Sequence, residues 1–111
     1  TGSIAMGNTA TASNTGAVAL GLGPQASGFG AVALGVDVVA SGNFSTAIGN
    51  LASTAGQEGA IVIGDNSVGF PTVVRATAPN QFVVRAAGGY KLFSNADTTA
   101  GVVLSAGSGS W

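Results

Sequence analysis

The side chains that could carry out chemistry are few, and none of them stands in a recognisable catalytic or metal-binding spacing. The 111-residue chain has three basic residues, four acidic residues, no His and no Cys. Missing His removes the commonest general base and metal ligand, and missing Cys excludes thiolate sites and disulfides. The acids lie far apart, at Asp37, Glu58, Asp65 and Asp97. We therefore expect no enzyme activity, no cofactor and no metal site.

Two arginines share the repeated context VVRA, at Arg75 and Arg85. If several copies of the chain surrounded a common axis, the two positions could form rings of guanidinium groups that bind an anion. The favoured interpretation is an ordinary ion pair with one of the acids Asp65, Asp97 or Glu58.

A few other residues could mark a binding site. Asp37 could contact a ligand or a metal, but a lone acid at a chain corner is more simply a solvated turn residue. Phe29 and Phe44 could belong to an adhesive surface, and packing against a neighbouring copy explains them equally well. With Lys91 as the only base besides the two arginines, we expect no binding to nucleic acid or to an anionic membrane.

An internal repeat of fourteen residues defines the elements that position these side chains. From residue 3 the segments are SIAMGNTATASNTG, AVALGLGPQASGFG, AVALGVDVVASGNF and STAIGNLASTAGQE, and a degenerate fifth copy ends one residue late at Gly64. The third position is always Ala, the fourth is Met, Leu or Ile, and the fifth is always Gly. Such self-similarity is typical of solenoids.

Each copy is expected to form two short strands separated by corners. The legs are about five residues of alternating character, too short for helices and rich in Gly that helices disfavour. Gly and Asn tolerate positive φ, so they indicate the corners. The expected corner residues are Gly7, Gly21, Gly35, Gly49, Asn14, Gly28, Gly42 and Gly56. The sequence therefore predicts an all-β fold, a flat parallel β-roll.

The distribution of large and small residues between the two faces of the first leg predicts self-association. We expect the large residues inside the roll: Ile4, Met6, Val18, Leu20, Val32, Leu34 and Ile48. This leaves Ala5, Ala19, Ala33 and Ala47 as an outer stripe and candidate oligomer interface. The alternative places the Ala stripe inside and the large residues between copies. Either orientation leaves one apolar face to be covered by a neighbour.

The repeated AVALGLGPQASG and AVALGVDVVASG closely resemble the head repeats of trimeric autotransporter adhesins, the YadA-like heads. The resemblance covers residues 3–64. It implies a left-handed parallel β-roll that packs as a homotrimer, anchored through the full-length protein in the outer membrane of a Gram-negative bacterium. It further implies attachment to host cells or extracellular matrix proteins, with no catalysis. Asn14, Thr46 and Asp37 depart from the family pattern, and the identity of a ligand does not transfer.

Residues 65–111 no longer follow the repeat, so we expect two regions, a head roll over 1–64 and a β-rich connector or cap over 65–111. Strands are expected at about 72–77, 81–86, 89–94 and 101–105. This half resembles segments that precede a chaperone-type trimerising end in bacterial surface proteins and phage tail fibres. A structural or receptor-binding segment of a trimeric phage tail fibre is therefore the alternative function.

Composition separates these hypotheses from two others. An ice-binding solenoid needs a regular array of Thr, and a polysaccharide-cleaving β-helix needs clustered carboxylates; the sequence has neither. A charged fraction of only 6 % favours self-assembly, because few charges keep copies apart. No apolar run reaches the length of a membrane span, so we expect a soluble piece without membrane contact whose targeting signal lies outside it.

Overall fold

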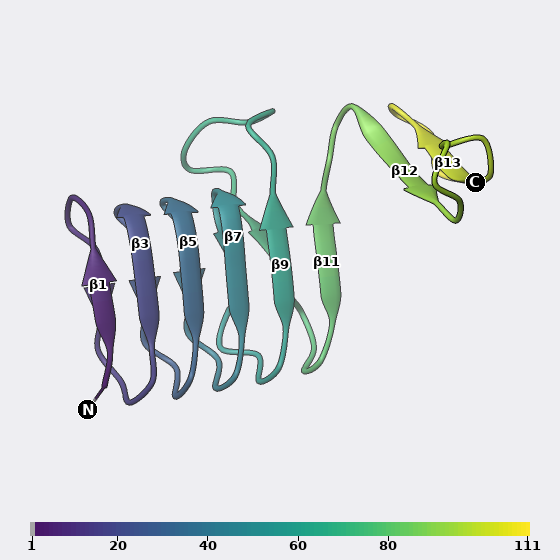
Figure 1. Cartoon of the computed structure of the whole chain (residues 1–111). Helices are drawn as coiled ribbons and strands as arrows, with labels where there is room; N and C mark the ends of the chain where they lie inside the picture. Colours follow the sequence, from purple (N-terminus) through teal and green to yellow (C-terminus); the bar gives the residue numbers. More distant parts are fainter. Residues whose placement is uncertain (1) are drawn as a thin grey trace.

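Short strands joined by tight corners make up the chain in the computed structural model, which describes residues 2–111 (Figure 1). The strands are β1 (Ile4–Met6), β2 (Thr11–Ala12), β3 (Val18–Leu22), β4 (Gln25–Ala26), β5 (Val32–Val36), β6 (Val39–Ala40), β7 (Thr46–Asn50), β8 (Ala52–Ser53), β9 (Ile61–Gly64), β10 (Val74–Arg75), β11 (Phe82–Arg85), β12 (Gly89–Phe93) and β13 (Gly101–Ser105).

Two parallel sheets form a flat solenoid. The odd-numbered strands β1 to β11 lie side by side in chain order in one sheet, and β2 to β10 do the same in the other (Figure 1). Ile4 pairs with Val18, Val18 with Val32 and Val32 with Thr46, so successive coils are fourteen residues apart. Thr46 then pairs with Ile61, which is the one-residue slip visible in the sequence. The expected all-β solenoid of parallel coils is confirmed.

The solenoid continues beyond the boundary expected at residue 64. Strand β10 pairs in parallel with β8, and β11 pairs with β9, so residues 74–85 add one more coil after an inserted loop. Only β12 and β13 leave the roll, as an antiparallel hairpin. The strands expected after residue 64 are present, the first shortened to Val74–Arg75. The expected boundary is wrong because Val74 and the FVVR segment have the alternation that the two sheets require.

The interior of the roll is lined by small residues on both walls, which corrects the expected faces. Ala19, Ala33 and Ala47 of the first leg are fully buried within a single chain, and Ala26, Val38, Ala40 and Ala52 of the second leg face them. Ala5 is exposed because its coil has a neighbour on one side only. The Ala stripe is therefore the core of the roll and not an outer surface.

The large residues expected inside lie on the outer face instead. Ile4 is 51 % exposed and Met6 65 %, Leu20 is also exposed, and Val18, Val32, Leu34 and Ile48 are partly exposed on the same side of the sheet. Coils of fourteen residues hold the two sheets close together, so the largest fully buried side chains are those of Val, Thr, Pro and Ser. The expectation that small residues on one wall require large ones opposite was wrong.

The residues whose positive φ turns the chain lie two or three positions after the expected corner residues. One corner has positive φ at Thr9, Gly23, Asp37 and Leu51, and the other at Gly16, Gly30, Phe44 and Gly59. Each corner stacks on the previous one: Asp37 N–H donates to Leu22 O and Phe44 N–H to Phe29 O. Asn14, Gly28 and Gly42 do begin the turns of the second corner, because their carbonyl oxygens accept from the N–H groups three residues later, but the positive φ expected at them is absent.

The repeated glycines allow the backbones of successive coils to approach each other closely. Gly7, Gly21, Gly35 and Gly49 do have positive φ, but they lie within or at the end of the first-leg strands. A Cβ on Gly21 would stand 2.0 Å from the carbonyl oxygen of Gly35, and one on Gly28 would stand 2.1 Å from that of Gly42. Gly56, with φ 77°, belongs to the turn of the longer coil.

A buried hydroxyl pair accommodates the extra residue of the fifteen-residue coil. In regular coils the N–H groups of Ser13 and Ser27 donate to backbone carbonyls of the next coil. The equivalent Ser41 N–H donates to Thr54 Oγ1 at 3.0 Å, because the Thr54 carbonyl accepts from Gln57 in the turn. Ser45 Oγ lies 3.0 Å from Thr54 Oγ1 and donates to Gly42 O, so both buried hydroxyls are satisfied.

Replacing Thr54 by Val is expected to destabilise the roll by about 1–3 kcal/mol, because the Ser41 and Gly42 N–H groups lose their acceptor in a buried position. Thermal unfolding followed by circular dichroism measures this loss. Thr54→Ser keeps the hydroxyl and should unfold close to the native temperature. Equal melting temperatures for the Val and Ser variants would contradict the role assigned to the hydroxyl.

Candidate functional surface

The outer side of the six-stranded sheet is a continuous hydrophobic surface, named here the aliphatic face. Strand register aligns its residues in two rows: Ile4, Val18, Val32, Thr46, Ile61 and Phe82, and beside them Met6, Leu20, Leu34, Ile48, Ile63 and Val84. Leu22 and Val36 extend it by a partial third row. These residues point outward because side chains alternate along a strand and their Ala neighbours fill the interior.

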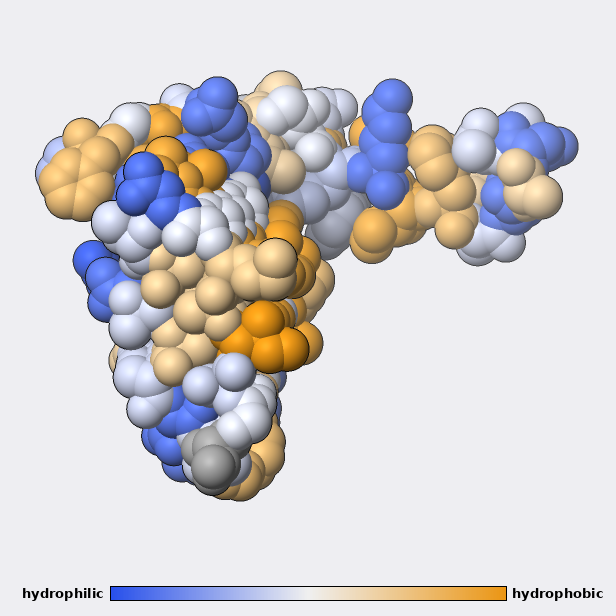
Figure 2. Space-filling view, turned by 60° about the vertical axis from the view of Figure 1, so that its left-hand side comes forward, coloured by the Kyte–Doolittle hydropathy of each residue, from blue (hydrophilic) through white to orange (hydrophobic). Residues whose placement is uncertain are grey.

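The aliphatic face carries no charged side chain along its two rows. Figure 2 shows hydrophobic residues gathered on one side of the solenoid, and the hairpin projects on that same side. The apolar patch spans six strands, and contiguous exposed apolar patches mark interaction sites. The face is therefore the strongest candidate for contact with another protein surface.

The outer side of the second sheet is polar, as the sequence predicts. Thr11, Gln25, Val39 and Ser53 follow one another in register, and Arg75 continues the row. Ser13, Ser27 and Ser41 form a second row beside it. This surface is named here the polar face. Thr11, Gln25 and Arg75 are exposed on it, whereas Ser53 is buried, and the exposed part stays accessible if the aliphatic face is covered.

A shallow hollow of about 290 Å³ lies on the polar face. Asp37, at a corner of the roll, and Arg75, on β10, both line it, and Phe70 from the inserted loop lies at its side. Asp37 is an exposed corner residue, as expected. Within residues 2–111 Arg75 forms no ion pair, so the pairing expected for it was wrong.

Arg85 and Asp65 join the end of the solenoid to the start of the hairpin. Arg85 Nε donates to Asp65 Oδ1 at 2.7 Å, and its Nη2 donates to the carbonyl oxygens of Asn50 and Asp65. Ala87 N–H donates to Asp65 Oδ2, and Ser67 Oγ donates to Oδ1. The ion pair expected for Arg85 is confirmed, and its role is to hold the chain where β11 ends.

These contacts make the stability of the fold depend on the charge of the Asp65 carboxylate. The N–H of Ala87, then Arg85 and Ser67, donate to the charged form and hold the pKa of Asp65 well below its usual value of 3.8. The stabilisation is complete above about pH 3.8 and is lost as the pH falls toward the lower pKa of the folded state.

We expect Asp65→Asn to lower the melting temperature at pH 7. The difference in melting temperature between this variant and the native protein should become smaller as the pH falls below about 3.8. Arg85→Gln removes the other partner and should also lower the melting temperature at pH 7. Thermal melts at several pH values measure both. A gap between the Asn variant and the native protein that does not change with pH would contradict this account.

Two aromatic side chains meet at a corner of the roll. The rings of Phe29 and Phe44 are 5.4 Å apart in an edge-to-face arrangement, and both are exposed. The sequence suggested either an adhesive surface or packing against a neighbouring copy, and the contact within the chain is consistent with each.

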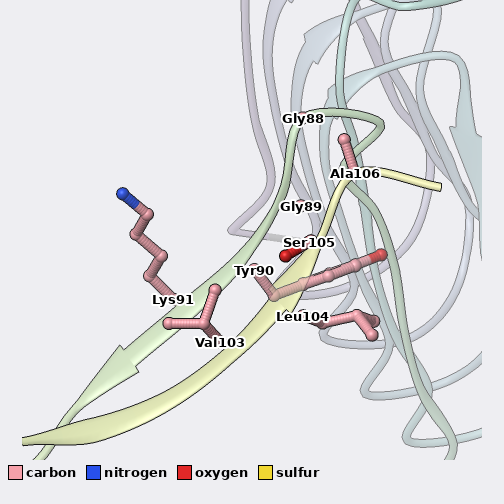
Figure 3. Close-up of a pocket in the computed structure, with 8 residues that line it drawn as sticks. All are labelled: Gly88, Gly89, Tyr90, Lys91, Val103, Leu104, Ser105 and Ala106. Atoms are coloured by element: carbon pink, nitrogen blue, oxygen red, sulfur yellow. The ribbon is translucent and has the colours of Figure 1, made fainter. Parts of the chain in front are cut away.

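The hairpin has two different faces. Tyr90 is directly opposite Leu104, and Leu92 opposite Val102, so these four share one face. Figure 3 shows Tyr90 and Leu104 pointing to one side of the hairpin, toward the solenoid, and Lys91 and Val103 pointing to the other. The Tyr90 hydroxyl donates to Val84 O and accepts from Ala86 N–H, which fixes the base of the hairpin against β11.

The depression at the hairpin base, drawn in Figure 3, offers little for catalysis. It is lined largely by Gly, Ala and aliphatic residues, with Lys91 as its only charged side chain. Asp97 lies in the hairpin turn, where Thr99 and Asn95 donate to it, so it is not the partner of an arginine. Within residues 2–111 no group of three or more acidic residues is placed to hold a metal ion.

The part of the chain that the structure describes contains no helix long and apolar enough to cross a membrane.

Comparison with known families identifies the first coils of the roll. Two stretches, residues 1–23 and 26–52, match the family described as the YadA head domain repeat. They correspond to the coils from β1 to the start of β8. No curated protein and no solved structure matches the chain significantly.

Proposed function

We propose that this chain is a non-catalytic adhesive segment that works as a homotrimer. The support is the match of residues 1–23 and 26–52 to the YadA head domain repeat, which indicates the head region of a YadA-like trimeric autotransporter adhesin. Heads of this family form trimers, and adhesins of the family are exposed at the cell surface and anchored in the outer membrane. Three copies pack their aliphatic faces together, and the three polar faces remain outside, where they contact the host.

The observation that carries the proposal is the placement of the large hydrophobic residues. A roll with an Ala-lined interior buries little apolar area within one chain, since Ala side chains are small. The residues that could contribute most, such as Leu20, Ile4 and Met6, are exposed on one flat face. Covering that face with identical copies at roughly 25 cal/mol per Å² adds the stabilisation that the thin core lacks.

Most of the charged side chains serve the fold or lie on the polar face. The one ion pair within residues 2–111, Arg85–Asp65, joins structural elements, and its carboxylate is fully occupied by donors. The groups left accessible on the polar face are hydroxyls, amides, Asp37 and Arg75. Such groups form hydrogen bonds with proteins and glycans equally, and we propose extracellular matrix proteins or cell-surface receptors as the partners.

Binding to immobilised collagen, fibronectin, laminin and a glycan array tests the adhesive function. Saturable binding of the assembled protein to at least one of them is expected. A matched variant with Gln25→Glu and Ser27→Glu alters only the polar face and should reduce that binding without changing the assembly. Failure of the trimer to bind any host surface would overturn the adhesive assignment.

A further inference from the structure

An apolar cleft of about 480 Å³ lies where the solenoid meets the hairpin. Ile63, Phe82 and Val84 of the aliphatic face form one wall, and Tyr90, Leu92 and Leu104 of the hairpin form the other. Trp111 closes one side. The lining has no charged group, so its chemistry suits an apolar occupant.

The cleft is open in a single chain. Phe82 is 68 % exposed, Trp111 72 % and Leu92 60 %. A two-stranded hairpin by itself is marginally stable in water and normally packs its apolar face against something. Only the Tyr90 end of this hairpin is held to the solenoid, by hydrogen bonds to Val84 and Ala86. Within residues 2–111, the apolar face formed by Leu92 and Val102 is therefore left exposed.

The hairpin extends over the side of the molecule on which another copy would pack. Figure 2 shows it projecting outward from the solenoid on the side where the hydrophobic residues gather. Ile63 and Val84, which line the cleft, continue the row that begins with Met6 and Leu20. The cleft thus continues the aliphatic face, and the hairpin forms its second wall.

We propose that the hairpin clasps a second copy of this chain: the exposed Leu92 and Val102 end of its apolar face packs on the neighbour's β9 and β11. This inference rests on the proposed homotrimer. Each copy places its hairpin on one neighbour and receives the hairpin of the other neighbour. Such a contact is heterologous, and with three copies it forms a closed ring. The exposed rings of Phe82 and Trp111 become buried between copies. The hairpin then locks the trimer at the end of the roll.

The single tryptophan of the chain reports directly on the cleft. In the assembled protein we expect blue-shifted Trp111 emission and weak quenching by acrylamide. A monomeric variant with Leu20→Glu and Leu34→Glu, which do not line the cleft, should show red-shifted emission and several-fold stronger quenching. A trimer whose Trp111 is as accessible as in the monomer would overturn the clasp while leaving the trimer itself intact.

Cross-linking between different chains identifies what covers the cleft. The chain has no Cys, so Phe82→Cys in one copy and Leu92→Cys in another can be joined by a short bis-maleimide only across an intermolecular contact. Co-expressed variants should give a linked pair, whereas Thr11→Cys with Gln25→Cys on the polar face should not. A trimer with buried Trp111 and no linked pair would mean another occupant and overturn the proposal. A monomeric native chain would overturn the proposed assembly as well.

Discussion

Replacing Leu34 by Glu is expected to convert the assembled protein into monomers. Leu34 lies in the middle of the aliphatic face, between Leu20 and Ile48 in register. Each copy in the trimer would bring a carboxylate into the shared interface, and an unpaired buried charge costs several kcal/mol. Association should weaken by roughly three orders of magnitude or more, because each 1.4 kcal/mol is tenfold. Sedimentation velocity at micromolar concentration measures the change.

Gln25→Glu is the matched control, because it adds the same charge to the exposed polar face of the preceding coil. It should assemble like the native protein. The Leu34 variant should keep its β-sheet circular dichroism, since Leu34 does not belong to the Ala-lined core of the roll. An intact trimer of Leu34→Glu would show that the aliphatic face is not the interface.

Gly35→Ala should unfold the roll. Gly35 has φ 135°, and a Cβ there would stand 2.0 Å from the carbonyl oxygen of Gly49 in the next coil. Both the backbone strain and the clash with main-chain atoms must be relieved by separating coils, at a combined cost of roughly 2–6 kcal/mol. Since that equals much of the stability of a small domain, we expect loss of the β-sheet signal or a much lower melting temperature.

Two other glycines separate the contributions to this effect. Gly56 has positive φ with open space around it, so Gly56→Ala measures strain alone, and Gly69→Ala has neither strain nor clash. The expected order of melting temperatures is Gly69→Ala close to native, Gly56→Ala lower and Gly35→Ala lowest. If Gly35→Ala and Gly56→Ala had the same melting temperature, the clash between coils would contribute nothing to the loss of stability.

The repeat made the coils predictable, because Ala, the aliphatic position and Gly return every fourteen residues and strand register follows that spacing. The slip before Gly64 was visible too, and the structure assigns it to a turn at Ala55 and Gly56. The sixth coil was not predicted, since the inserted loop moves Phe82 twenty-one residues beyond its partner Ile61 and hides the period.

The faces of the first leg could not be chosen from alternation alone. Ala19 and Leu20 lie on opposite sides of one strand, and the pattern is the same whichever side faces inward. What decides is the width of the interior, which depends on where the corners lie. Corners at residues such as Asp37 and Phe44 carry no glycine, so their positive φ is invisible in the sequence.

The sequence predicted that an apolar surface would be left for a neighbour, but it did not predict which residues form that surface. An apolar face left over for a neighbour follows from either orientation, and the structure places it on Leu20 and Leu34 in place of Ala19 and Ala33. The cleft beside Trp111 forms because the hairpin projects from the end of the roll next to β9 and β11 (Figure 2), a tertiary arrangement that no local pattern contains.

The molar mass in solution, from light scattering coupled to size exclusion, tests the central claim most directly. The aliphatic face and the YadA head repeats predict three times the 10.5 kDa of a single chain, unchanged over a tenfold dilution. A well-folded species with the mass of one chain would show that the aliphatic face is stable in water and would contradict the proposed assembly.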